Sequence, residues 1–288
     1  MKKKTKWIII TVVVVVVGFW GARLVDKALT PAIGLLEIDG TISQSMEYLE
    51  MIKEYEDDDQ IKAVLIRLDS PGGRVGPSQE IYGALGRLKQ TKPVIVSLAS
   101  VGASGAYYIA CAADTIFALP GTVTGSIGVI MEFIDVSEGL QKLGVKGQSI
   151  TSGKMKDAGT PFRPMKDDEY AYFKSLAVDI HEQFIEAVSV SRSIPETKVR
   201  EYSDGRVFSG RQALALGLID KLGGFDESLE EAKQRAGLTD RVRIVRLKKH
   251  MTLLENMKQL ITSYSPLLLG QSGGIGHGRL IRIEYSMP

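Results

Sequence analysis

The chain has 288 residues, of which 44% are hydrophobic and 24% charged, so it can bury one sizeable core and is not a disordered protein. Its single cysteine, Cys111, excludes an intrachain disulfide and a metal site built from several thiolates. The three histidines, His181, His250 and His277, lie far apart without a second ligand at metal spacing, so we expect no metal and no cofactor.

The first 27 residues differ from the rest of the chain. Residues 1–27 hold six basic groups and one acid, which leaves a net charge of −3 for the remainder, and that remainder gives no reason to expect nucleic-acid binding. The apolar run Trp7–Ala22 follows a lysine cluster and would reach about 24 Å as a helix, close to a hydrocarbon core of about 30 Å. The only two tryptophans, Trp7 and Trp20, flank this run, as interfacial anchors do.

We expect an uncleaved signal anchor with a cytoplasmic N-terminus. A cleaved signal peptide is the alternative. It is disfavoured because large or charged residues stand where cleavage requires small residues.

Strands and helices alternate after a short link at residues 28–33. The pattern predicts, in order, a strand from Gly34, a helix at Ser45–Asp58, a strand at Ile61–Leu68, a Gly-rich turn at Asp69–Gly76, a helix with Ile81, Leu85 and Leu88 on one face, a strand opened by Pro93 and an Ala-rich helix at Ala106–Ala113. Cys111 lies among the alanines of that helix and is expected to be a small core residue. This alternation indicates an α/β domain with largely parallel strands.

The second half of the chain is predicted to be mainly helical. A long helix begins at Asp167 and carries an apolar stripe of residues at three- and four-residue steps from Tyr170 to Val188. Shorter elements follow: helices at Ser209–Gly217 and Asp226–Ala236, a strand at Val242–Leu247, an amphipathic helix at 251–265, a Gly-rich link at 270–278 and a final strand at Leu280–Tyr285. We therefore divide the chain into a basic stub and anchor (1–27), a link (28–33), a folded domain (34–250) and a C-terminal segment (251–288).

Ser104 follows a buried strand and precedes the Ala-rich helix. At such a turn a hydroxyl can stand clear of the sheet, and the next backbone N–H groups are free because the first helical turn leaves them unpaired. These groups could serve as a nucleophile and as part of an oxyanion hole. The alternative is that Ser104 only caps the helix.

Three further features could complete a site with Ser104. They are the turn Asp69–Gly73 (DSPGG), Ser126 within the Gly-broken run Thr122–Val129, and the lysines Lys154 and Lys156. Each has an ordinary alternative: a Pro-Gly turn, a strand-edge serine and two solvated lysines that strand geometry cannot tell apart. Because no His–Asp pair is placed to serve Ser104, its base would have to be a lysine whose pKa burial has lowered.

Five motifs occur together in a characteristic order: DSPGG, ASGAYYIACAAD, TVTGSIGV, SGKMKDAG and GRVFSGRQALALGLID. In these motifs the chain resembles the signal peptide peptidase A family, the membrane-anchored Ser–Lys peptidases of bacteria. The resemblance covers Leu35 to Ala236 and extends to the N-terminal anchor. It implies a Clp/crotonase-like spiral ββα domain that follows an N-terminal transmembrane helix.

The resemblance also implies roles for individual residues. Ser104 matches the family's nucleophile, Lys156 rather than Lys154 matches the general base, and Ser126 matches the serine that orients the lysine. The oxyanion hole would be formed by the Gly105 amide together with Gly72 or Gly73.

The function implied is degradation of hydrophobic signal peptides after their release from preproteins. The expected location is the bacterial cytoplasmic membrane, with the catalytic domain on its outer side. The expected assembly is a homo-oligomeric ring in which serine and lysine can come from neighbouring subunits. A crotonase-like acyl-CoA enzyme and a catalytically silent membrane scaffold are the alternatives, but neither has a use for both Ser104 and Lys156.

Overall fold

The computed structural model describes residues 30–239, 242–247 and 283–285. The predicted anchor at 7–22, the amphipathic helix at 251–265 and the link at 270–278 lie outside the described residues. Within the described ranges no helix is long and apolar enough to cross a bilayer.

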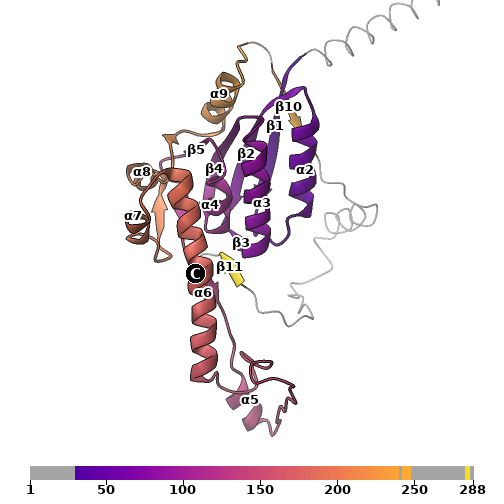
Figure 1. The fold of residues 1–288 in the computed structure, drawn as a ribbon, viewed down its shortest axis with the longest axis vertical. Coiled ribbons are helices and arrows are strands. Elements are labelled where there is room, and N and C mark those ends of the chain that lie inside the picture. Colours follow the sequence, from indigo (N-terminus) through magenta and orange to yellow (C-terminus); the bar gives the residue numbers. More distant parts are fainter. Residues whose placement is uncertain (1–29, 240–241, 248–282, 286–288) are drawn as a thin grey trace, which may run out of the picture.

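The centre of the fold is a sheet of mostly parallel strands (Figure 1). Its order is β10 (Arg243–Arg246), β1 (Ala32–Asp39), β2 (Ile61–Ser70), β4 (Val94–Ala103), β5 (Thr115–Ala118) and β9 (Lys221–Leu222), with each neighbouring pair parallel. Strand β6 (Val123–Gly125) pairs in parallel with the end of β4, and β8 (Val207–Ser209) pairs antiparallel with β6. The prediction of a mixed α/β domain with largely parallel strands is confirmed.

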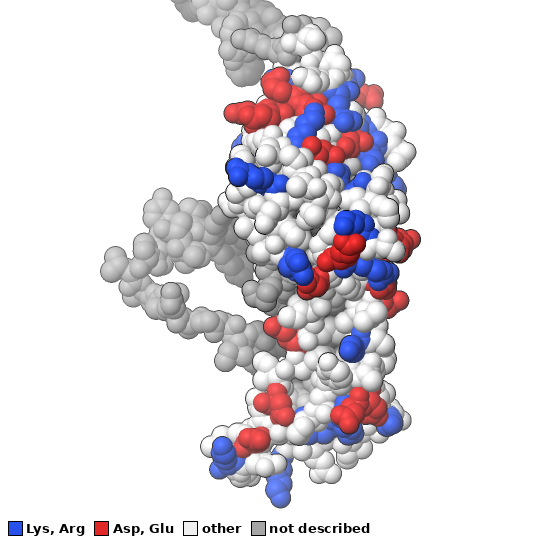
Figure 2. Space-filling model, turned by 90° about the vertical axis from the view of Figure 1, so that its left-hand side faces the viewer, with Lys and Arg blue, Asp and Glu red and all other residues white. Residues whose placement is uncertain are grey.

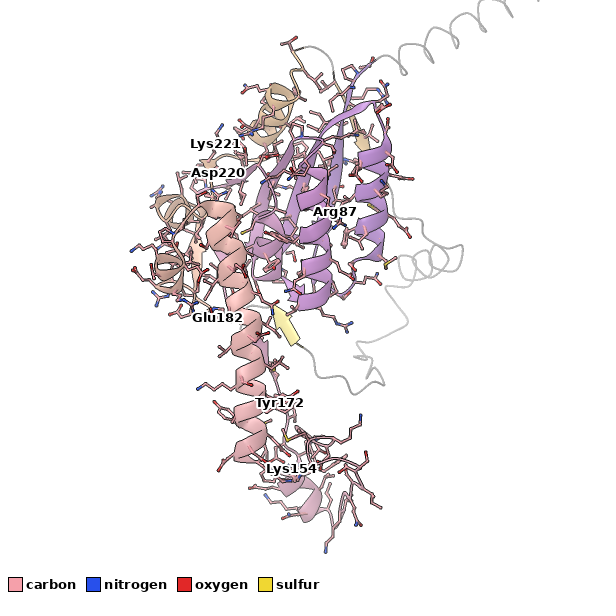
Figure 3. All side chains as sticks on the ribbon, in the orientation of Figure 1. Arg87, Lys154, Tyr172, Glu182, Asp220 and Lys221 are labelled. Carbon is pink, nitrogen blue, oxygen red and sulfur yellow. The ribbon has the colours of Figure 1, made fainter. Side chains whose placement is uncertain are left out.

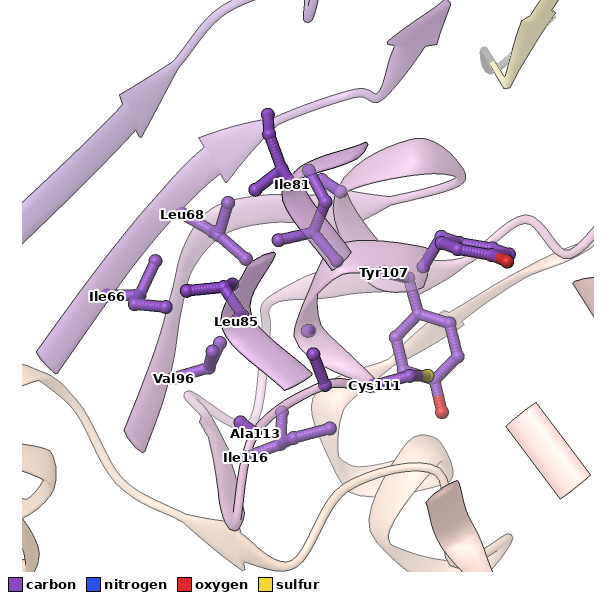
Figure 4. Close-up of a cluster of buried hydrophobic side chains, with 14 of the residues drawn as sticks. Ile66, Leu68, Ile81, Leu85, Val96, Tyr107, Cys111, Ala113 and Ile116 are labelled. Carbon is purple, nitrogen blue, oxygen red and sulfur yellow. The ribbon is translucent and has the colours of Figure 1, made fainter. Parts of the chain in front are cut away.

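Alternating side chains on the strands bury both faces of the sheet. On β2, Val64 and Ile66 join the cluster under helices α2 (Met46–Asp57), α3 (Val75–Leu88) and α4 (Gly105–Ala110), while Leu65 joins a smaller cluster under α9 (Phe225–Arg235). Figure 4 shows the larger cluster, with Leu85 of α3 between strand residues of β2 and β4. Each fully buried Leu or Ile contributes roughly 1.5–3 kcal/mol to folding, so helices cover both faces of the sheet.

Cys111 lies at the end of α4 inside the larger cluster, beside Tyr107 (Figure 4). Burial raises the pKa of its thiol from 9.0 to about 11. At pH 8 we therefore expect the folded protein to react with a thiol reagent at least about a hundredfold more slowly than the denatured chain, since only the thiolate reacts. Absorbance after addition of a disulfide reagent measures this rate, and denaturant should release one thiol per chain. Rapid labelling of the folded protein would contradict this placement of Cys111.

Several predicted boundaries move in the structure. The predicted turn at Asp69–Gly76 contains the end of β2, the short strand β3 (Gly73–Arg74) and the start of α3. Helix α4 stops at Ala110 rather than continuing to Ala113, because Asp114 ties the chain back to β4: the N–H of Asp114 donates to Val94 O and its carboxylate accepts the N–H of Val94. The later helices α8 (Gly210–Ala215) and α9 lie within or close to their predicted ranges.

Helix α6 (Asp167–Arg192) is half outside the domain. Its second half packs into the core through Phe184 and Val188, whereas Tyr170 at the start of the predicted stripe is exposed. Figure 1 shows the first half projecting from the body together with α5 (Ser137–Lys142). We call residues 132–178 the arm. The arm carries large apolar side chains in the open: Ile134, Leu143 and Ile150 are 74%, 77% and 95% exposed.

Strand β11 (Ile283–Tyr285) is close to the C-terminus in sequence, but in the structure it lies beside α3. It pairs antiparallel with β3 on one side and with β7 (Ile130–Met131) on the other. The final strand predicted at Leu280–Tyr285 is thus present over its described residues.

The charges on the surface are mixed. On the face seen in Figure 2, basic and acidic groups alternate along the length of the molecule, and broad uncharged areas lie between them. This face has no continuous basic patch of the kind that nucleic acids require.

Candidate active site

Three parallel strands end at the same edge of the sheet. Ser70 of β2 is aligned with Gly102 of β4, and Ala103 of β4 is aligned with Gly125 of β6. Carboxyl ends of parallel strands are where α/β proteins place their sites. The register therefore brings together the DSPGG loop, Ser104 and Ser126, each of which directly follows or ends one of these strands.

Ser104 occupies a backbone conformation that L-residues rarely adopt. It connects β4 directly to α4 with φ 55° and ψ −123°, and its N–H donates to Gly125 O at 2.8 Å. Such strain costs about 1–3 kcal/mol and persists only where the surrounding structure enforces it. A sharp strand-to-helix turn of this kind presents a nucleophilic hydroxyl at the top of a sheet.

The hydroxyl of Ser104 does not cap the helix. Although Ser104 stands at the N-cap position of α4, its side chain makes no capping hydrogen bond. Its Oγ is buried and has no hydrogen-bond partner among the described residues. The capping interpretation is therefore wrong for this chain, and the hydroxyl is free to react. Gly105 is the first residue of α4, where amides have no partner within the helix.

Ser126 is a second buried serine with a positive φ, of 52°. Within the described residues only three residues other than glycine have positive φ, and two of them are Ser104 and Ser126. The N–H of Ser126 donates to Arg206 O at 2.9 Å, which fixes the turn after β6. The two predicted site serines thus hold strained turns at the ends of adjacent strands.

The DSPGG loop is also held tightly. Gly72 has a φ of +106°, and its N–H donates to Ser70 Oγ at 3.1 Å. A Cβ atom on Gly73 would lie 2.1 Å from Ile42 O, so only glycine fits there. The N–H of Gly72 is thus used inside the loop, and Gly73 pairs with Tyr285 of β11, so both predicted oxyanion glycines are held in place.

Lys156 is not brought to Ser104 in the same chain. It lies in a turn of the arm, where its N–H donates to Gly153 O at 3.0 Å, and its side chain is exposed. Figure 3 shows Lys154, two residues earlier, at the far end of the arm from the sheet. The segment is a turn rather than a strand, so the alternation expected of an extended segment does not apply. The burial expected for a neutral lysine is absent within one chain.

His181, for which the sequence indicated no ligand role, shares a pocket with Ser126. Both residues line a pocket of about 410 Å³ together with Ser203. The Nε2 atom of His181 is buried and has no hydrogen-bond partner among the described residues. No sequence signal could have paired them, because 55 residues separate them and His181 stands alone on its helix.

Among the residues described, no group of three or more His, Cys, Asp or Glu side chains is arranged to hold an ion.

Comparison with known proteins decides the family. Residues 86–239, which include Ser104, Ser126 and Lys156, match the sequence model of peptidase family S49. The chain belongs to this family. The S49 match begins within α3 and ends just after α9, so it includes Ser104, Ser126 and the arm but not β2 or the DSPGG loop.

Individual S49-like relatives are proteases by name. A putative protease of Synechocystis sp. is 38% identical over 208 residues, which are 72% of this chain and 75% of that protein. The chloroplastic serine protease SPPA of Arabidopsis thaliana is 35% identical over 86% of this chain but only 36% of its own length. A putative signal peptide peptidase SppA of Enterococcus faecium is 34% identical over 67% of this chain and 56% of its own length. Membership of a peptidase family sets aside the crotonase-like acyl-CoA alternative.

Proposed function

We propose that this S49 peptidase is a serine endopeptidase with a Ser104–Lys156 dyad. The observation that carries the proposal is the Ser104 hydroxyl: it is buried, without a partner, and held on a strained turn at the head of a helix. A serine kept in this conformation without a structural hydrogen bond has a chemical use.

The lysine is supplied by a second copy of the chain. Within one chain Lys156 is exposed on the arm whereas Ser104 is buried, and the arm also exposes Ile134, Leu143 and Ile150. Exposed apolar side chains gathered on one segment are typical of an interface. We therefore place the arm of one subunit against the sheet edge of its neighbour, where burial would lower the pKa of the amine. This assembly agrees with the ring that the family resemblance implies.

The reaction follows from these positions. Ser104 Oγ attacks the scissile carbonyl carbon while the neutral Lys156 amine takes the hydroxyl proton. The amides of Gly105 and Gly73 hold the resulting oxyanion, and Ser126 orients the amine. Collapse of the tetrahedral intermediate breaks the C–N bond, and Lys156 gives its proton to the leaving amine. Water then hydrolyses the acyl-enzyme by the same proton transfers in reverse order.

A peptide substrate fits the neighbourhood of the site. Strand β11 is an extended segment that pairs antiparallel with both β3 and β7, directly beside Gly73. Strand addition is a common way of binding an extended peptide through its backbone. A substrate strand that takes the place of β11 on this pairing surface would lie next to the oxyanion donors.

The substrate and location rest on the sequence. We propose hydrophobic signal peptides as substrates, because the motifs resemble those of signal peptide peptidase A and the E. faecium relative carries that name. We further propose that residues 1–27 anchor the chain in the cytoplasmic membrane with the catalytic domain outside, because a lysine cluster precedes the apolar run.

An ion pair on Lys154 supports Lys156 as the base. Lys154 Nζ lies 2.6 Å from Asp168 Oδ2, and this hydrogen bond raises the pKa of Lys154, so the amine keeps its proton. We expect Lys154→Ala to retain at least about a third of wild-type kcat. Hydrolysis of an apolar fluorogenic peptide measures this. An inactive Lys154→Ala beside an active Lys156→Ala would show that the base is wrongly assigned.

The proposed function is tested by labelling with a fluorophosphonate probe and mapping the modified residue. We expect a single adduct at Ser104 in the assembled protein. An adduct at another serine would identify a different nucleophile. Absence of any adduct together with absence of peptide hydrolysis would favour the silent scaffold.

A further inference from the structure

The turn that carries Lys156 is attached to a buried ion pair. Arg163 donates from Nη1 to Glu169 Oε2 at 2.9 Å and from Nη2 to Glu169 Oε1 at 2.5 Å. Glu169 is only 1% exposed and also accepts the N–H of Lys166 at 3.2 Å. The hydrogen bonds from Arg163 lower the pKa of Glu169 to about 2, so the pair is fully charged at neutral pH. Such two-point pairs fix geometry more tightly than single contacts do.

The same guanidinium holds the residue next to Lys156. Nη2 of Arg163 lies 3.1 Å from Asp157 Oδ2 and donates to Asp157 O at 3.5 Å. On the other side of Lys156, Lys154 is paired with Asp168 in the first turn of α6. Both flanks of Lys156 are therefore fixed to the start of one long helix.

The carboxylates in these contacts are all paired with cations other than Lys156. Asp157 and Glu169 are paired with Arg163, Asp168 with Lys154, and Lys166 Nζ lies 3.8 Å from Glu169. In the part of the chain that the structure describes, the Lys156 amine has no ion-pair partner. A lysine that pairs with a carboxylate holds its proton more strongly and becomes a poor base.

We infer that Arg163 and Glu169 form a clamp that positions Lys156 for the neighbouring subunit and keeps carboxylates away from its amine. Arg163 and Glu169 are positioning residues, since neither reaches the reacting atoms. The inference rests on the proposed function, in which the arm of one chain supplies the base to the serine of another.

Mixed oligomers separate this role from a general contribution to folding. One chain carries Ser104→Ala and donates only its arm, and the other carries Lys156→Ala and donates only its serine. Glu169→Gln is introduced into either the arm-donating or the serine-donating chain, and kcat and KM are measured for an apolar peptide. We expect kcat to fall roughly tenfold to a hundredfold, with KM little changed, when the change is in the arm donor. In the serine donor, whose arm has no lysine to position, the loss should be far smaller.

The charge effect has its own readout. With Arg163→Gln in the arm donor, Asp157 and Glu169 lose their cation and can pair with Lys156, so the pH profile of kcat/KM should move to higher pH. Arg163→Lys should restore part of the loss, because it keeps the charge without the two-point geometry. Arg200→Gln is the matched control: it breaks a two-point pair with Glu182, on α6 outside the arm, and should change neither kcat nor the pH profile (Figure 3).

Three results would overturn the clamp. Equal losses in the two mixed oligomers would mean that Glu169 serves folding or assembly alone. The clamp would also be overturned if Arg163→Gln left the pH profile unchanged. It would likewise be overturned if Arg200→Gln lowered kcat as much as the changes in the clamp do. If the unsubstituted mixture is inactive while wild type is active, the shared site itself is wrong. The clamp is then tested in oligomers made of a single variant. In these, Arg163→Gln must still move the pH profile of kcat/KM to higher pH.

Discussion

Ser104→Ala is expected to lower kcat/KM for peptide hydrolysis by at least about a thousandfold, because nucleophile and base act as one unit. The fold should be kept. The hydroxyl has no hydrogen bond to lose within the described chain, and the strained backbone is held by the pairing of β4 with β6. Initial rates on a fluorogenic peptide, with thermal unfolding measured in parallel, check both parts.

Ser193→Ala is the matched control for this experiment. Ser193 is the third described residue other than glycine with positive φ, at the C-terminal end of α6, so the change is the same but the location is different. It should leave peptide hydrolysis at the wild-type level. Retained activity in Ser104→Ala, with the protein folded, would remove Ser104 from the mechanism.

Mixing two inactive variants is expected to restore activity. Ser104→Ala and Lys156→Ala should each be inactive alone, but after dissociation and reassembly a mixed oligomer combines the serine of one chain with the lysine of another. With random assembly, half of the serines are intact and half of their neighbours carry the lysine, so about a quarter of wild-type activity should return. Activity measured against the mixing ratio should peak at equal amounts.

The result that would contradict the shared site is an inactive mixture whose chains have demonstrably exchanged. Exchange is followed by fluorescent labels on the two variants. A site completed within one chain would give that outcome, and it would require the arm to fold back onto its own sheet edge.

The sequence predicted the sheet edge better than the arm. The positions of Ser104 and Ser126 follow from motifs in which the local chain determines the turn, and the parallel register then brings those turns together. Helix α4 shows the limit of local propensity, since the alanines up to Ala113 favour a helix but the hydrogen bonds of Asp114 to β4 end it earlier.

The surroundings of the arm could not be predicted from the stripe on α6. Phe184 and Val188 of this stripe lie in the main core, but Phe173 is buried against Phe133 of the arm, and Tyr170 is exposed. Periodicity shows which face of a helix is apolar and not what covers it. The role of Arg163 was missed for a related reason, since its three acidic contacts depend on the turn that precedes α6.

A base supplied by the arm of a neighbouring chain would connect catalysis to the amount of protein present. A monomer would then contain the proposed nucleophile and base without bringing them together, so its specific activity would depend on mass action between chains. Dilution below the dissociation constant of the assembly would leave subunits that are folded but inactive. An anchor that confines the chains to one membrane plane would raise their local concentration. Such an enzyme would be active once its chains are concentrated in the membrane and nearly inactive while they are dispersed. Other polypeptides would then be protected from hydrolysis before insertion.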